Sequence, residues 1–221
     1  MSKILIMLEL QQKLNDNTNG KGWENGLTAQ GKKIDWRRCI YLEAAELVES
    51  YPWKHWKNID AKVDTDNVKV ELVDIWHFVM SEVLRVNALG DARDLKELAS
   101  DIEASIANEN VEYLQDYYAQ IEAIEELIEK LFCNFELVDF TATFFRLCEK
   151  LGLGFDELYS LYIGKNILNI FRQDHGYKDG TYIKVWNGKE DNVVMQEILA
   201  NNSNIGVDEL YKELEKRYPK S

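Results

Sequence analysis

Four carboxylates occupy two segments of the chain with a spacing that suits a metal site. Glu43 and Glu46 are three residues apart, and so are Glu71 and Asp74. Residues three apart lie on one face of an α-helix, so each pair presents two carboxylates on the same side. A set of oxygen ligands without nitrogen or sulfur suits the hard cation Mg²⁺. The chemistry that this pattern suggests is that of a Mg²⁺-dependent enzyme.

Two helices must position these carboxylates. The first is expected from about Asp35 to Tyr51, with its apolar residues on one arc and its acids on the other. The second is expected over 68–86, where 12 of 19 residues are apolar and surround the helix, so we expect it to be buried. Burying an ionised carboxylate without a partner is costly. We therefore expect the helices to pair antiparallel, with the four carboxylates facing one another and His77 extending the same side.

Other interpretations of these acids stay open. Taken alone, the acids of the first helix are typical of a solvated face, and His77 is typical of a satisfied core histidine. A carboxylate-bridged di-iron bundle is suggested by Asp74 and His77 at i and i+3, but such sites use two Glu-x-x-His pairs and the chain has three histidines in all. A non-catalytic helical interaction module would explain a solvated acidic surface, but not the buried acids.

A second group of residues near the C-terminus is basic. Lys165, Asn169 and Arg172 stand at i, i+4 and i+7, which places them on one helical face. More lysines follow, interleaved with glycines and tyrosines. An amphipathic helix with a basic edge is the simple interpretation. Beside a metal–carboxylate site, however, converging lysine and arginine side chains are what a polyphosphate requires.

Composition limits the remaining possibilities. The chain has 221 residues, 46 % hydrophobic content and only two prolines, which favours an all-α protein with a substantial core. A formal net charge of −13 argues against a nucleic-acid partner or an anionic membrane partner. No apolar run is long enough for a membrane span, and three cysteines without C-x-x-C spacing fit reduced thiols. We expect a cytoplasmic protein.

The organisation expected along the chain is one all-α catalytic domain over 1–221, a helical bundle with peripheral helices. Its core is expected at about 35–86 and 135–173. The region of about 90–134 is expected to form acidic peripheral helices, because twelve acidic and three basic residues lie between Asp91 and Lys130. The segment of about 174–192, rich in glycine, lysine and aromatic residues, is expected to stay open without ligand and to close over it.

Several motifs together resemble one enzyme family. LQQKLN, WRRCIYLEAAELVES, WKHWKN, VELVDIWHF and YIGKNILNIFRQDHGYKDGTYIKVWNGKEDN are similar to segments of the dimeric all-α dUTPases, which belong to the all-α nucleoside triphosphate pyrophosphatase superfamily. The last block is long, polar and specific. The central acidic region carries no matching motif. The resemblance implies the helical bundle of that superfamily and a homodimer.

The resemblance also implies roles for individual residues. Metal ligands would be Glu43, Glu46, Glu71 and Asp74, with Glu46 as our candidate catalytic base. Groups at the base and sugar would be Gln12 and Asn15 at the uracil edge, His77 at the deoxyribose, Asn192 closing over the base, and Trp56 and Phe78 at the pocket wall. Phosphate-binding residues would be Lys165, Asn169, Arg172, Tyr177 and Lys184. Where relatives can carry an aromatic residue, this chain has His55.

The activity implied is Mg²⁺-dependent hydrolysis of dUTP, and of dUDP, to dUMP with release of diphosphate or phosphate, which limits uracil incorporation into DNA. Water activated by the metal is the expected nucleophile, and the metals with lysine and arginine would stabilise charge developing on the phosphates. The alternative within the superfamily is a dCTP or general dNTP pyrophosphatase.

Overall fold

The computed structural model describes residues 2–58, 60–106, 111–202 and 205–219. The chain divides into two compact units, Met1–Leu158 and Tyr159–Ser221. The boundary falls within helix α7 (Phe155–Asp174). The prediction of one catalytic domain over 1–221 concerns how these units work together, and it stays a prediction.

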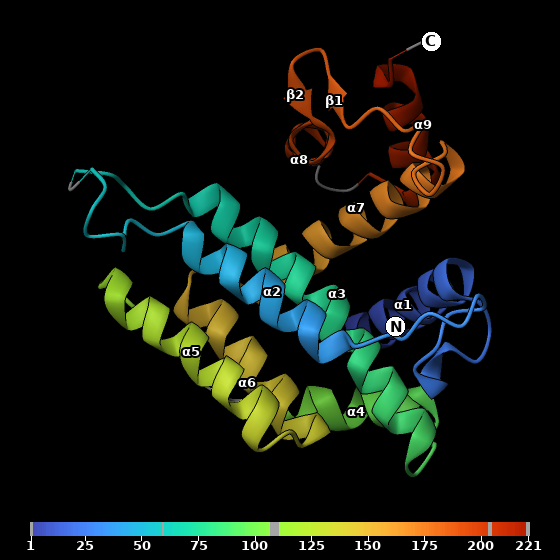
Figure 1. Cartoon of the computed structure of the whole chain (residues 1–221), viewed down its shortest axis with the longest axis horizontal. Helices are drawn as coiled ribbons and strands as arrows, with labels where there is room; N and C mark the ends of the chain where they lie inside the picture. The colour runs from blue at the N-terminus through green and yellow to red at the C-terminus, as the bar shows by residue number, and fades with distance from the viewer. Residues whose placement is uncertain (1, 59, 107–110, 203–204, 220–221) are drawn as a thin grey trace. The chain divides into compact units, whose positions relative to one another are not determined.

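The first unit is helical throughout its regular structure (Figure 1). A short 3₁₀ turn, η1 (Trp23–Asn25), lies in the glycine-rich loop after the first helix. The α-helices before α7 are α1 (Lys3–Asn19), α2 (Trp36–Glu49), α3 (Thr65–Leu89), α4 (Leu95–Ile106), α5 (Tyr117–Cys133) and α6 (Leu137–Lys150).

Helices α2 and α3 form the antiparallel pair that the sequence predicts, and they lie side by side along their length (Figure 1). Each begins at an aspartate cap: the carboxylate of Asp35 accepts from the backbone N–H of Arg38, and that of Asp64 accepts from the backbone N–H of Asn67 at 3.0 Å. α3 is longer than the predicted 68–86 at both ends: the Asp64 cap starts it at Thr65, and it continues to Leu89 before Gly90.

Helix α3 is buried on nearly all sides, as expected. Trp76 at its centre is fully buried, stacks on Phe144 with ring centroids 5.2 Å apart, and donates its indole N–H to Sδ of Met7. The carboxylate of Glu82, 1 % exposed, accepts from Arg37 of α2 and Arg85 of α3. This burial is achieved within one chain, so the apolar surface of α3 does not by itself require a second subunit.

The acidic middle region forms amphipathic helices, as predicted. α4 and α5 pack against α6 through buried apolar residues such as Ile102, Ile124 and Leu127. The glutamates of α5 lie on its exposed side: Glu122, Glu125, Glu126 and Glu129. The acids of α5 are therefore a solvated face.

The second unit continues α7 into a small mixed fold. It contains the hairpin strands β1 (Val185–Trp186) and β2 (Lys189–Glu190), and the helices α8 (Asp191–Asn201) and α9 (Val207–Arg217). α8 was not predicted. Its core consists of Ile167, Leu168, Phe171, Trp186, Val194, Met195, Ile198, Leu210 and Leu214.

The segment expected to be an open loop is partly built into this core. Trp186 is 1 % exposed, and its indole N–H donates to the carbonyl of Ile183 at 2.7 Å. The rings of Phe171 and Tyr218 lie 5.7 and 5.3 Å from it. Trp186 of this segment is therefore a core residue, and the expected closing of the segment over a ligand stays a prediction.

The fold class is all-α, as predicted: the described residues form nine α-helices and one two-stranded hairpin. None of the helices in the described part of the chain is both long and apolar enough to cross a membrane.

Candidate functional site

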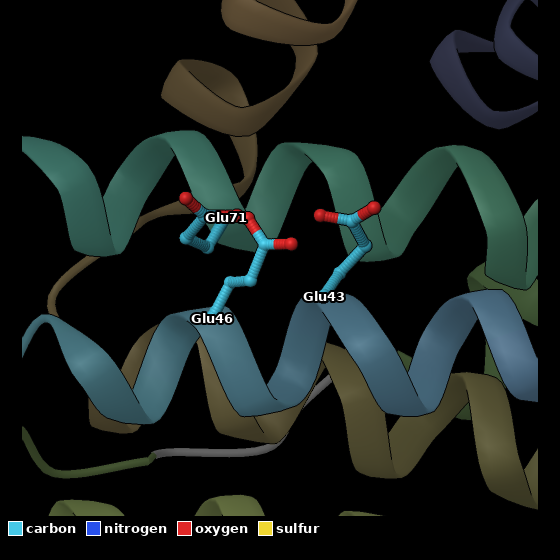
Figure 2. A group of neighbouring side chains, drawn as sticks. All are labelled: Glu43, Glu46 and Glu71. Atoms are coloured by element: carbon cyan, nitrogen blue, oxygen red, sulfur yellow. The ribbon is translucent and has the colours of Figure 1, made fainter.

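The carboxylates of Glu43, Glu46 and Glu71 converge between α2 and α3. Figure 2 shows Glu43 and Glu46 rising from α2 toward α3, where Glu71 lies. One carboxylate oxygen of each residue lies within 4.8 Å of the others. Glu71 is buried at 8 % exposure, Glu43 is half-buried and Glu46 is exposed. The i, i+3 spacing on α2 and the antiparallel partner produce this convergence.

The donor set of this group fits a hard divalent cation. All three donors are carboxylate oxygens, which Mg²⁺ prefers, and the group contains neither histidine nor cysteine. Three negative charges at this separation repel one another, and a cation between them reverses that interaction. The group opens toward solvent on the side of Glu46, where a bound ion would retain contact with water.

Asp74 lies one helical turn beyond Glu71 on α3 and is half-buried. It is not among the residues whose oxygens gather within 4.8 Å. Its role as the fourth ligand stays a prediction. Glu49, one turn beyond Glu46 on α2, forms an ion pair with Lys54 instead.

A buried polar network joins α1 and α3. The amide Nε2 of Gln11 donates to Oγ of Ser81 at 3.1 Å and to Oδ1 of Asn15 at 3.2 Å. Nδ2 of Asn15 donates to the same Oγ at 3.0 Å, and Oγ of Ser81 donates to the carbonyl of His77 at 2.8 Å. Nδ1 of His77 lies 2.9 Å from Oε1 of Gln11. The network thus links Asn15 to His77 through Ser81, while their contacts with the uracil edge and the deoxyribose stay predictions.

Two members of this network, Gln11 and Ser81, were missed from the sequence. Each has a partner four residues away on its own helix, Asn15 and His77 respectively, and that spacing was the available signal. Gln12, which was predicted instead of Gln11, donates to Oδ1 of Asp16 at 3.1 Å and to Oε1 of Glu24 at 2.9 Å. Its contact with uracil stays a prediction.

The predicted pocket-wall residues lie in different surroundings. Phe78 is half-buried and stacks on Trp36, with centroids 5.9 Å apart and an interplanar angle of 27°. Trp56 is 63 % exposed and meets Trp53 edge to face at 5.7 Å. His55 is exposed beside Trp56. Trp36, which was not predicted as a site residue, is therefore the direct partner of Phe78.

Five of the predicted phosphate-binding and base-closing residues gather in the second unit. Nζ of Lys165 donates to Oδ1 of Asn192 at 3.0 Å, and Nη1 of Arg172 donates to Oδ1 of Asn169 at 3.2 Å. The ring of Tyr177 lies 5.8 Å from the guanidinium of Arg172. We call Lys165, Asn169, Arg172, Tyr177 and Asn192 the cationic cluster.

Asp191 holds this cluster together and was missed from the sequence. Fully buried, it accepts from Nε of Arg172 at 2.8 Å and from Nη2 at 2.9 Å, a bidentate pair. The hydroxyl of Tyr182 donates to the same carboxylate at 2.8 Å. Burial acts to raise the pKa of Asp191, but the hydrogen bonds and charge of Arg172 outweigh it and the pKa is lowered. Burial and then Asp191 raise the pKa of Tyr182.

Lys184, also predicted to bind phosphate, lies outside this cluster. Its side chain is half exposed, and its Nζ lies 3.5 Å from a carboxylate oxygen of Glu190, which is equally exposed. Its predicted role stays a prediction.

Most of the chain matches a known protein family. A family model described as dUTPase matches residues 3–177. The match includes both carboxylate pairs, the α1–α3 network and the cationic cluster up to Tyr177, and it ends before Asp191 and Asn192. No curated protein matches the chain significantly. Because the matched region spans well over half of the sequence, the chain belongs to the dUTPase family and is an enzyme that hydrolyses dUTP.

Proposed function

We propose that the enzyme depends on Mg²⁺ and cleaves dUTP to dUMP and diphosphate, and dUDP to dUMP and phosphate. The observation that carries the proposal is the convergence of Glu43, Glu46 and Glu71 within 4.8 Å on the α2–α3 pair. Carboxylates alone form this group, which favours a hard cation over the iron of a carboxylate–histidine bundle.

We assign roles to the three carboxylates according to their exposure to solvent. Glu43 and Glu71, the less exposed members, hold the ion, with Asp74 from the next turn of α3 as a further ligand. When bound, Mg²⁺ supplies a water of lowered pKa and stabilises charge on phosphate oxygens. Glu46 is the most exposed member and is our candidate to accept the proton from the attacking water.

The base and sugar are assigned to the polar groups around α1 and α3. Asn15, with both amide donor and amide acceptor, suits the alternating acceptor and donor groups of the uracil edge, and His77 is assigned to the deoxyribose. Gln12, Phe78 and Trp56 remain assigned to the base pocket, and Asn192 of the second unit is assigned to closing over the base.

The phosphates are assigned to the cationic cluster and Lys184. Arg172 is held rigidly by Asp191, so its guanidinium needs no further ordering before it binds an anion. Lys165 adds a second positive charge, and Asn169 and Tyr177 orient Arg172. Positive charge here would offset negative charge that develops on the leaving phosphate.

The test is a product assay across dUTP, dUDP, dCTP, dATP, dGTP and dTTP, with Mg²⁺ and with a chelator. We expect dUMP with diphosphate from dUTP, dUMP with phosphate from dUDP, and no turnover without the metal. Equal rates on dUTP and dCTP would favour a general dNTP pyrophosphatase, and full turnover in chelator would exclude the metal role.

We also propose a homodimer, which the family resemblance implies. Apolar side chains exposed on α2 and α5 offer a surface for it: Tyr41, Leu42 and Phe132 are 44, 51 and 55 % exposed, and the rings of Tyr41 and Phe132 are 6.0 Å apart. Light scattering at micromolar concentration tests the assembly. A mass near the 25.8 kDa of one chain would refute it.

A further inference from the structure

The hydroxyl of Ser81 has one proton, and its neighbours determine where that proton goes. Oγ of Ser81 lies 2.8 Å from the backbone carbonyl oxygen of His77, and a carbonyl oxygen can only accept. The single proton of Ser81 is therefore used in that bond. The lone pairs of the same oxygen remain, and they need donors.

Two amide groups supply these donors, which fixes how both amides are oriented. Gln11 approaches Oγ of Ser81 at 3.1 Å and Asn15 approaches it at 3.0 Å. Each must approach with its NH₂ end, because an amide oxygen in that place would face the hydroxyl oxygen with no proton between them. A flipped Gln11 would also bring its oxygen against Oδ1 of Asn15, which is 3.2 Å away.

The orientation of Gln11 in turn fixes the proton of His77. With Nε2 of Gln11 directed to Ser81, its Oε1 faces Nδ1 of His77 at 2.9 Å. An amide oxygen only accepts, so Nδ1 carries the proton. In the neutral ring Nε2 is then an acceptor.

Because these groups are buried, their hydrogen bonds to one another determine the amide orientations and the histidine tautomer. Gln11 and Asn15 are each 3 % exposed, His77 is 5 % exposed and Ser81 is fully buried. Bulk water does not reach these groups to substitute for a missing donor. Two acceptors or two donors that face each other there therefore cost the full free energy of an unsatisfied buried polar group. The hydroxyl of Ser81 therefore acts on His77 from a distance, through Gln11.

We propose that Ser81 and Gln11 are positioning residues that hold His77 in the Nδ1–H tautomer, so that Nε2 accepts a hydrogen bond from the 3′-hydroxyl of the nucleotide. The part concerning the sugar rests on the proposed function. The deoxyribose of dUTP has one hydroxyl, which is a donor, and the acceptor at Nε2 complements it. The opposite tautomer would present a donor to the nucleotide and would favour an acceptor in that place.

The tautomer can be measured on the free protein by NMR with ¹⁵N-labelled histidine. The chain has three histidines, and His77→Gln assigns the signal. At pH 8, above the ordinary histidine pKa of about 6.5, we expect protonated Nδ1 and unprotonated Nε2 in the wild-type protein. Protonated Nε2 in the wild-type protein would overturn the proposal, whatever the variants do.

Ser81→Ala removes the hydroxyl that requires both NH₂ ends, so we expect the His77 signals to show both tautomers. Thr141→Val is the matched control. Thr141 is also fully buried in the first unit, and its Oγ1 donates to the carbonyl of Leu137, four residues back on α6. This control should leave the tautomer unchanged. A single Nδ1–H tautomer in Ser81→Ala would show that the serine does not set it.

Kinetics test the sugar contact separately. We compare kcat/KM for dUTP with that for 2′,3′-dideoxyuridine triphosphate, which lacks the hydroxyl. The wild-type enzyme should prefer dUTP by about tenfold, the value of one good hydrogen bond. In Ser81→Ala this preference should fall in proportion to the population of the Nδ1–H tautomer that is lost, chiefly through KM. Equal kcat/KM for the two nucleotides with the wild-type enzyme would overturn the sugar contact, and the wild-type preference retained in Ser81→Ala would overturn the role of Ser81 in it. If neither nucleotide is hydrolysed by the wild-type enzyme, the proposed function fails, while the NMR result still decides the tautomer.

Discussion

The carboxylate group of the first unit and the cationic cluster of the second gather charge in opposite ways. Glu43, Glu46 and Glu71 bring three negative charges within 4.8 Å. In the cationic cluster the guanidinium of Arg172 is matched by a bidentate bond to buried Asp191. The first arrangement places like charges close together, and a bound cation would relieve their repulsion, whereas the second includes an internal counter-charge. Removing one carboxylate should therefore have opposite effects on stability at the two places.

The largest effect is expected on turnover at the carboxylate group. Glu46→Gln keeps the size of the side chain but removes the proton acceptor, so kcat should fall by about a hundredfold or more. Far-UV circular dichroism should be unchanged, because Glu46 is exposed. The matched control is Glu49→Gln, one turn along α2, which loses only an ion pair with Lys54 and should retain near-normal kcat. Full activity of Glu46→Gln would exclude it as the base.

The second effect is a loss of stability at the cationic cluster. Asp191→Asn leaves the guanidinium of Arg172 mostly buried without its counter-charge, which should lower the free energy of unfolding by about 3 kcal/mol and raise KM for dUTP more than it lowers kcat. Denaturant unfolding and steady-state kinetics measure the two changes. Glu190→Gln is the control, since its ion pair with Lys184 is exposed. Equal stability of the two variants would contradict the structural role of Asp191.

The same carboxylate predicts a dependence on pH. Because the pKa of Asp191 is lower in the folded protein than its ordinary value, the unfolded chain binds the proton first as the pH falls. Its stabilising contribution is therefore complete above the unfolded value of about 3.9 and is lost as the pH falls through the lowered folded value. The stability difference between the wild-type protein and Asp191→Asn should shrink over that window. A difference that stays constant from pH 7 down to acid unfolding would argue against the ion pair.

These two regions also show what the sequence can and cannot predict. Glu43, Glu46 and Glu71 were found because the spacing of acids along a helix, and one unusually apolar helix, are local patterns. Asp191 and Tyr182 were missed because their role depends on contacts around Arg172, which lies 19 and 10 positions away in the chain. The run KEDN, in addition, has the composition of an exposed surface segment. Ser81 was missed although His77 stands four residues before it, because its amide partners Gln11 and Asn15 come from another helix.

The secondary structure was predictable where the periodicity was long. The predicted helices at 35–51 and 68–86 differ from α2 and α3 only at their ends, where aspartate caps decide the boundary. The short helix α8 was overlooked behind a stretch rich in glycine and lysine, although Val194 and Ile198 stand four apart on its buried side. Trp186 was placed in a loop because the distant Tyr218, which packs on it, is invisible to local patterns.

A smaller change in stability is expected at the carboxylate group, opposite in sign to that of Asp191→Asn. In the absence of metal, Glu46→Gln should raise the free energy of unfolding by about 0.5 kcal/mol, because it removes one of three mutually repelling charges. Millimolar Mg²⁺ should raise the melting temperature of the wild-type protein and have less effect on this variant. Calorimetry with and without Mg²⁺ measures both. A variant less stable than the wild-type protein without metal would show that repulsion is not the dominant interaction there.

The smallest expected effect concerns access to the tip of the hairpin in the second unit. Lys184 and Lys189 are exposed on either side of Asn187 and Gly188, where the backbone takes positive φ, so trypsin can reach them in the free enzyme. Burial of Trp186 limits how far this segment opens, so we expect cleavage to be slow. A non-hydrolysable dUTP analogue together with Mg²⁺ should slow it a further few-fold, because the nucleotide supplies counter-charge to the lysines and orders the segment. Either ligand alone should protect less. Equal cleavage rates with and without both ligands would remove the closing role of the segment of about 174–192 and would leave Lys184 without a function in binding phosphate.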